Sequence, residues 1–185
     1  MKQIDPQETA CVCACLEGAT DNFRFLLERH QGAVYRIAWR MTNHAGDAEE
    51  IAQESFLKAY KALHRYDGKH AFSTWLYRIV VNTCLDRLRR TRREIVQDQE
   101  LSADDELTTP YEQQERAECV QNALARLPEA YRMILILKDV EELDYETIAE
   151  TLRENIPALK IRVLRGREKL REKLEKMYPD WFLRV

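Results

Sequence analysis

The sequence predicts an all-α protein made of two small helical domains joined by a flexible acidic linker. Its 185 residues include only five glycines and five prolines, a composition that favours helices with short connections. Apolar residues recur at helical spacing along most of the chain, and one strongly acidic stretch near the middle loses that spacing. No pair of segments has the alternation and turn residues of a β-hairpin.

The overall composition excludes a chain that is disordered throughout, because 45% of the residues are hydrophobic and 33% are charged. No apolar run approaches the roughly 20 residues that span a bilayer, and the first residues lack the apolar stretch of a signal peptide. The protein is therefore expected to be cytoplasmic, with no direct membrane insertion. In that reducing compartment the five cysteines are expected to be thiols.

The first domain is predicted at residues 1–93. Apolar residues repeat with helical spacing between residues 9 and 42, where Thr20 or Asp21 is a candidate N-cap. A break follows at 43–46.

The next helix is predicted over residues 48–63, with Asp47 as its N-cap. A turn at Tyr66–His70 then leads to an aromatic and basic helix that begins near Phe72 and ends among arginines at 87–93.

The linker is predicted at residues 94–110, and the second domain follows at 111–178, with a short tail at 179–185. The predicted helices of the second domain cover residues 111–126, 129–140, 145–152 and 156–177. Pro128 suits the start of the second of these helices, and Asp144 is a candidate cap of the third.

Charge is distributed unevenly along the chain, although the total is only −3. Residues 67–93 carry seven Lys or Arg against two acids, residues 94–118 carry nine acids against one Arg, and residues 153–176 carry nine Lys or Arg against four acids. Local fields act over a Debye length of about 8 Å at physiological salt. Two basic segments can therefore bind nucleic acid despite the acidic total.

The two helices at 145–152 and from Ile156 onward have the spacing of a helix-turn-helix, whose second helix enters a major groove. Apolar residues of both helices are expected to pack together, with Asn155 capping the second helix. The candidates that remain to face DNA are Ala158, Lys160, Arg162 and Arg165. The alternative is a solvated amphipathic hairpin.

The helix from Phe72 combines aromatic residues with cations and amides. Aromatic rings can stack on unpaired bases, each stack being worth about 1–3 kcal/mol, while arginines hold the backbone. This combination suits melted DNA better than closed duplex. Core packing of Trp75 is the alternative for that residue, because aromatic side chains dominate core energetics.

Four motifs in order resemble the extracytoplasmic-function (ECF) sigma factors of the bacterial sigma-70 family. They are DAEEIAQESFLKAYKAL at 47–63, FSTWLYRIVVN at 72–82, LPEAYR at 127–132 and LDYETIAE at 143–150. The resemblance covers about Leu16 to Leu174. It implies a sigma region 2 helical bundle followed by a sigma region 4 helix-turn-helix.

The resemblance also implies site residues. The residues that would bind the clamp helices of the largest subunit of core RNA polymerase are Asp47, Glu50, Gln53, Glu54 and Lys58. The loop from Tyr66 to Ser73 would take a flipped base of the minus-10 element, and helix residues would line the adjoining DNA path. The minus-10 candidates are Tyr66, Lys69, His70, Phe72, Trp75, Arg78, Asn82, Asp86 and Arg87. The helix from Ile156 would read the minus-35 element with Asn155, Ala158, Lys160, Arg162 and Arg165.

One stretch departs from the family pattern. Relatives usually have Gly at the helix-turn-helix turn, where this chain has Arg153-Glu154, and Gly-Thr where it has Pro157-Ala158. The minus-35 contacts are therefore less transferable than the other contacts.

Three cysteines, Cys11, Cys13 and Cys15, lie close together near the N-terminus. Cys11 and Cys15 are four residues apart, so both can face the interior of a helical domain, whereas Cys13 points elsewhere. A packing role is the main interpretation, and a redox or metal sensor is the alternative.

No catalytic residues, cofactor or metal site are predicted, because the histidines and serines lack the spacing of known catalytic or ligand sets. The rivals to a sigma factor are a conventional helix-turn-helix regulator that binds duplex DNA and a module that sequesters another protein. Two basic faces joined by an acidic linker also suggest a compact inhibited state or an anti-sigma factor between the domains. Such a factor could hold the protein at the membrane.

Overall fold

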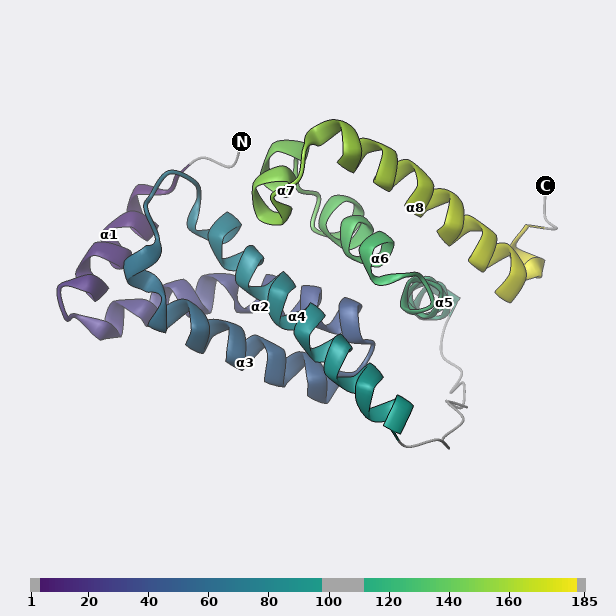
Figure 1. The fold of residues 1–185 in the computed structure, drawn as a ribbon, viewed down its shortest axis with the longest axis horizontal. Helices are drawn as coiled ribbons and strands as arrows, with labels where there is room; N and C mark the ends of the chain where they lie inside the picture. The colour runs from purple at the N-terminus through teal and green to yellow at the C-terminus, as the bar shows by residue number, and fades with distance from the viewer. Residues whose placement is uncertain (1–3, 98–111, 183–185) are drawn as a thin grey trace.

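The computed structural model describes residues 4–97 and 112–182, which contain helices and no strand (Figure 1). The α-helices are α1 (Pro6–Leu16), α2 (Phe23–Thr42), α3 (Ala45–Lys61), α4 (Phe72–Gln97), α5 (Glu112–Ala125), α6 (Glu129–Leu135), α7 (Tyr145–Leu152) and α8 (Ile156–Met177). Shorter turns are the 3-10 helices η1 (Thr20–Asn22), η2 (Leu63–Arg65) and η4 (Pro179–Trp181) and the π-helical turn η3 (Ile136–Val140). The predicted all-α fold class with two helical domains is confirmed.

The first domain is a bundle in which α2, α3 and α4 pack on one another and α1 covers one end of α2. Each of these long helices carries an apolar stripe, and the stripes meet in the interior. Leu26 and Val34 of α2, Ile51 of α3 and Leu76 of α4 are at most 1% exposed. The regular spacing in the sequence therefore accounts for the bundle.

The second domain packs α8 across α6 and α5, with α7 at one end. Gly166 of α8 is buried against Leu135 of α6, and a Cβ atom at position 166 would lie 3.3 Å from Leu135 Cγ. The absence of a side chain at Gly166 therefore lets the two helices approach closely.

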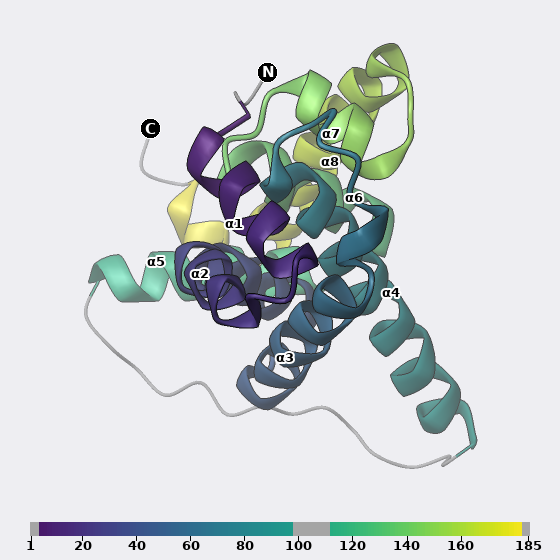
Figure 2. The same ribbon diagram turned by 90° about the vertical axis from the view of Figure 1, so that its left-hand side faces the viewer.

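The two domains lie against each other, and their buried apolar residues form one connected cluster. Helix α7 packs on α4, and α2 contacts α5 and α6 (Figures 1 and 2). Buried Arg132 of α6 donates to the carbonyls of Leu124 and Leu127 in its own domain and to the carbonyl of Met41 in the first domain, at 2.5 Å. This guanidinium therefore joins the two domains.

Two predicted caps of the first domain are wrong. Asp47 does not cap α3; His44 is the N-cap, and its Nδ1 accepts a hydrogen bond from the Asp47 backbone N–H at 3.1 Å. Asn43 ends α2 in the left-handed conformation, so the chain turns directly into α3. The N-cap of α3 therefore lies three residues earlier than predicted. Thr20 and Asp21 lie inside η1 and do not cap α2.

Both predicted caps of the helix-turn-helix are confirmed. The Asp144 carboxylate accepts from the Thr147 N–H at 2.7 Å, and the Asn155 side chain accepts from the Ala158 N–H at 2.9 Å. Each residue is extended, as an N-cap requires.

Helix α4 runs to Gln97, beyond the predicted domain boundary at residue 93. Residues 94–97 were expected to lack helical structure and are helical. The remainder of the predicted linker, residues 98–110, lies outside the described residues, as does residue 111, the first residue of the predicted 111–126 helix.

Candidate nucleic-acid interface

The helix-turn-helix is held by apolar contacts between α7 and α8. Ile148 of α7 and Leu159 and Val163 of α8 are at most 2% exposed, as their spacing predicts. Arg153 ends α7 in the left-handed conformation, with φ of 57°, at the turn where family members usually have Gly. The turn is therefore retained in this chain at the cost of a strained backbone.

The outer face of α8 carries the minus-35 candidates. Lys160 and Arg165 are exposed, whereas Ala158 and Arg162 are half-buried. Arg162 forms a two-pronged ion pair with Glu154, with two N–O distances of 2.7 Å. Of these cations, Lys160 and Arg165 are thus the more accessible to a DNA groove.

Two apolar residues of α8 were missed by the sequence reasoning. Ile161 and Leu164 are 52% and 60% exposed, one helical turn apart on the outer face. Apolar side chains in a major groove can contact the methyl group of thymine. Their position off the buried stripe of Leu159 and Val163 is the sequence signal that could have identified them.

Arg78 of α4 lies where the two domains meet. Its Nη2 donates to the backbone carbonyl of Glu150 on α7 at 2.5 Å, and its buried Nε has no hydrogen-bond partner. Burial and the nearby charge of Arg153 lower the pKa of Arg78. A negatively charged group beside Arg78 would favour the charged guanidinium and so offset this lowering of the pKa.

The loop before α4 is built on an aromatic cluster. The Tyr66 hydroxyl donates a hydrogen bond to the backbone carbonyl of His70 at 2.7 Å. The ring centroids of Tyr66, Phe72 and Trp75 lie 5.5–5.6 Å from one another. Phe72 is only 1% exposed and supports the loop from beneath, while Trp75 is half-buried against the core. Lys69 is exposed at the loop surface, and its Nζ lies 3.5 Å from Asp67 Oδ2.

The loop also reaches the second domain, since His70 Nδ1 lies 2.8 Å from the Glu150 carboxylate. Glu150 therefore covers two minus-10 candidates, His70 through its side chain and Arg78 through its backbone carbonyl. Asn82 and Asp86 continue along α4 and are exposed.

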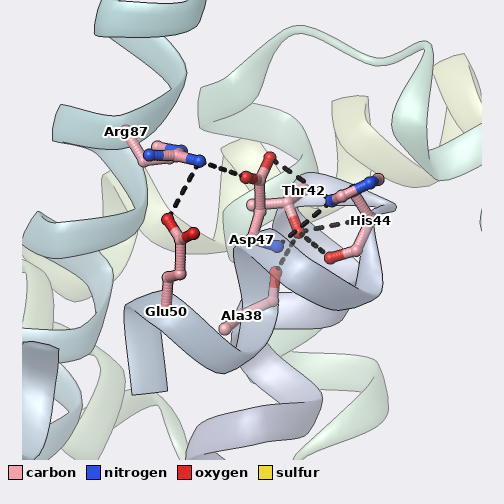
Figure 3. Close-up of polar contacts among 6 residues, drawn as sticks. All are labelled: Ala38, Thr42, His44, Asp47, Glu50 and Arg87. Atoms are coloured by element: carbon pink, nitrogen blue, oxygen red, sulfur yellow. Dashed lines mark hydrogen bonds and ion pairs between the residues drawn. The ribbon is translucent and has the colours of Figure 1, made fainter. Parts of the chain in front are cut away.

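The polymerase-binding candidates lie along α3. Glu50 and Gln53 are exposed, Asp47 is half-buried, and Glu54 pairs with Lys58 at 2.8 Å. Figure 3 shows Arg87 of α4 bridging Asp47 and Glu50, so a minus-10 candidate contacts two polymerase candidates. The exposed apolar residues Leu57 and Tyr60 of α3 were not predicted.

A cavity of about 520 Å³ lies between the domains, at the junction of α4 with α6, α7 and α8. Its lining includes Arg78, Asn82 and Arg89 of the first domain and Arg153, Glu154 and Arg162 of the second. Of the DNA-facing candidates, Arg78 and Asn82 of the first domain and Arg162 of the second therefore line one basic, partly apolar space.

The cysteines are arranged as their spacing predicts: Cys15 is buried, Cys11 is partly buried against the core and Cys13 is exposed. Burial raises the pKa of Cys15, and it raises the pKa of Cys84 to about 12. Within residues 4–97 and 112–182, no helix is long and apolar enough to cross a membrane.

The chain matches two family models, Sigma-70 region 2 at residues 26–94 and Sigma-70 region 4 at residues 117–170. The ECF RNA polymerase sigma factor SigW of Bacillus subtilis is 33% identical over 172 residues, a match that covers 85% of this chain and 91% of the relative. The RNA polymerase sigma-H factor of Pseudomonas aeruginosa is 33% identical over 171 residues, covering 85% of this chain and 89% of the relative.

Two solved structures have the same fold. The sigma factor RpoE in complex with the anti-sigma factor NepR from Bartonella quintana superposes with a TM-score of 0.71 at 22% identity, over 83% of this chain and 97% of that chain. CnrH in complex with the cytosolic domain of CnrY superposes with a TM-score of 0.70 at 24% identity, over 92% and 98%. The family models and the relatives together establish that this chain belongs to the ECF class of sigma-70 family sigma factors, which are transcription initiation factors and not enzymes.

Proposed function

We propose that this protein binds core RNA polymerase through α3 and directs it to promoters by contacting the minus-10 strand with the first domain and the minus-35 element with the second. The observation that carries this proposal is that the region 2 and region 4 matches fall on two separate helical domains, with Glu50 and Gln53 exposed on α3 of the first and Lys160 and Arg165 exposed on α8 of the second. Two basic surfaces on one chain are suited to binding one DNA molecule at two places.

The first domain is suited to capture of a melted strand. The Tyr66, Phe72 and Trp75 rings provide a rigid aromatic base beneath the 66–71 loop, and Arg78 has a buried N–H without a partner. Extruding a base from the stack costs a few kcal/mol, which contacts in the loop would supply. In the second domain, Lys160 and Arg165 would contact the minus-35 DNA, flanked by Ile161 and Leu164.

The arrangement of the domains suits an inactive state of the free chain. Glu150 holds His70 and Arg78 against α7, which covers part of the minus-10 surface. Helix α3 lies on the side of α4 away from α7, with Glu50, Gln53 and Leu57 exposed (Figures 1 and 2). Polymerase could therefore bind first, and DNA binding would follow separation of the domains.

An anti-sigma factor is a proposed partner. Of the two proteins with the same fold, RpoE was solved in complex with the anti-sigma factor NepR, and CnrH was solved in complex with the cytosolic domain of CnrY. The interdomain cavity offers Val81, Leu85 and Met133 beside its arginines, which suits an amphipathic acidic segment. The protein would act in the cytoplasm, where polymerase and DNA are available.

Transcription from a randomised promoter library by purified bacterial core polymerase, with and without this protein, tests the proposal. We expect specific initiation only when the protein is added, and we expect Asn82→Ala and Tyr66→Ala to change or abolish the selected minus-10 sequence. Glu17→Ala, an exposed change outside all three proposed surfaces, serves as the control. No initiation and no binding to core, with duplex binding retained, would instead indicate a conventional helix-turn-helix regulator.

The closed state is tested by the distance between fluorophores placed on α3 and α8. Glu150→Ala removes the carboxylate that faces His70, and Glu146→Ala, on the same helix, is its control. We expect Glu150→Ala to lengthen the distance in the free protein and to raise promoter binding without polymerase. Equal distances for both variants would contradict a closed state held by Glu150.

A further inference from the structure

Helix α1 lies outside the region 2 match, which begins at residue 26, yet it packs on the elements that hold the 66–71 loop. It contacts α2 and also η2, the turn that leads directly into this loop. Helix α1 therefore covers the core and also contacts the segment from which the loop starts.

The polar contact between α1 and α2 is a buried pair. Glu8 Oε1 of α1 lies 2.9 Å from His30 Nε2 of α2, and the two residues are 5% and 7% exposed. Because a carboxylate only accepts hydrogen bonds, Nε2 is the donor, and the imidazole ring is held in one orientation. Arg29 Nε approaches the same carboxylate oxygen at 3.1 Å, so the buried charge is further compensated.

The oriented imidazole contacts the aromatic cluster. The His30 ring centroid lies 5.6 Å from that of Phe72, and Phe72 lies 5.6 Å from Tyr66 in an edge-to-face arrangement. Tyr66 in turn donates its hydroxyl to the His70 carbonyl within the loop. Burial raises the pKa of Tyr66, and the charges of Glu8 and Asp67 contribute to this shift.

We infer that Glu8 and His30 are positioning residues for the 66–71 loop, and that α1 thereby contributes to selection of the minus-10 base. The inference rests on the proposed function of that loop. Glu8 fixes the His30 ring, His30 supports Phe72, and Phe72 with Tyr66 sets the height and angle of the loop backbone. Without the pair, the imidazole can rotate and the aromatic cluster can relax. A loop displaced by a fraction of an ångström would discriminate less between bases.

A buried hydrogen-bonded pair can also serve stability alone, so the test needs a variant that keeps stability. Replacing a buried pair with apolar residues of similar volume is often neutral or stabilising. The double change Glu8→Leu/His30→Leu should therefore fold, yet it removes both the hydrogen bond and the ring contact with Phe72. Glu8→Gln retains an oxygen that can accept from His30 and serves as the conservative variant. Val12→Ala, a buried residue of the same helix at 4% exposure, controls for general weakening of α1.

The readout is transcription by the holoenzyme, formed from core polymerase and the full chain, on templates that carry each of the four bases at the captured minus-10 position. We expect Glu8→Leu/His30→Leu to reduce discrimination between the best and the other bases by roughly tenfold, within the hundredfold that an ångström of misplacement can cost. Glu8→Gln should restore most of the discrimination, and Val12→Ala should retain it. Affinity for core polymerase should be unchanged in all three.

Wild-type discrimination by the folded double variant would overturn the inference, as would an equal loss in Val12→Ala. Hydrogen exchange of the 66–71 amides provides a second measurement: exchange should accelerate in the double variant and not in Val12→Ala. Tyr66→Ala distinguishes a failure of the proposed loop function from a failure of the Glu8–His30 pair to position the loop. If Tyr66→Ala also leaves base selection unchanged, the proposed function of the loop fails; if it changes selection while the double variant does not, only the role of the pair fails.

Discussion

The guanidinium of Arg36 on α2 donates two hydrogen bonds to the carboxylate of Glu141, at 3.0 and 2.9 Å, across 105 residues of sequence. The Glu141 side chain is 5% exposed, whereas that of Arg36 is 55% exposed. The hydrogen bond to Glu141 and its charge raise the pKa of Arg36. This planar pair ties the first domain to the end of η3 in the second.

Arg36→Ala should loosen the docking of the two domains. It leaves the buried Glu141 carboxylate without this partner, which we expect to cost about 1–3 kcal/mol of unfolding free energy. Small-angle scattering should report a larger radius of gyration, and urea unfolding a lower stability. Arg24→Ala is the matched control, because Arg24 lies on the same helix, is exposed and pairs within that helix, with Glu28. Identical scattering for the two variants would exclude a docking role for Arg36.

Arg132→Lys should destabilise the protein by about 3 kcal/mol, measured by urea unfolding. A single ammonium group cannot reach the carbonyls of Met41, Leu124 and Leu127, which the guanidinium contacts together. Arg126→Lys, at an exposed position of the same segment, should change stability by less than about 0.5 kcal/mol. A loss at Arg126 as large as that at Arg132 would argue against the carbonyl contacts as the cause.

Arg153→Gly should stabilise the second domain. Arg153 has φ of 57°, where a side chain costs about 1–2 kcal/mol relative to Gly, partly offset by the greater freedom of Gly in the unfolded chain. We expect a net gain near 1 kcal/mol, which raises Tm by roughly 2–4 °C for a chain of this size. Asn43→Gly, also at φ of 57°, should gain less because Asn tolerates this conformation. An unchanged or lower Tm for Arg153→Gly would show that Arg153 makes compensating contacts.

Stability should fall as the pH rises above about 9. The Cys84 thiol has a pKa of about 12 in the folded protein against 9.0 as the ordinary value, because burial disfavours the thiolate. The folded state thus retains a proton that the unfolded state loses, so this contribution is fully present below pH 9 and is lost towards pH 12, with a slope of up to about 1.4 kcal/mol per pH unit.

Urea unfolding at several pH values between 8 and 11 measures that slope. Cys84→Ala should reduce it without abolishing it, since burial also raises the pKa of Tyr77 to about 12. Cys13→Ala, at an exposed position, should leave the slope unchanged. A slope that is the same in Cys84→Ala as in the original protein would mean that Cys84 ionises when folded.

Local sequence signals predicted most of the helices because such signals act within a few residues. Asp144 and Asn155 cap α7 and α8 as expected, since the cap and the amide it satisfies are three residues apart. The same reasoning placed the cap of α3 at Asp47, and it failed because the left-handed Asn43 and the ring of His44 make the tight turn instead. It also ended α4 too early, because the arginines at 87–93 predicted a helix C-terminus there, whereas α4 runs to Gln97.

Sequence patterns alone predicted the fold class, the two domains and the residue types of the candidate interfaces, because helical periodicity, charge and motif spacing are local properties. Which of these residues meet depends on how the helices pack in three dimensions. Glu150 contacts His70 and Arg78, and Arg132 contacts Met41, because α7 docks on α4 and α6 docks near the end of α2. Such contacts depend on shape and burial summed over both domains. The support of the 66–71 loop by Glu8 and His30 has the same origin, since 22 residues separate them along the chain and 2.9 Å in the fold.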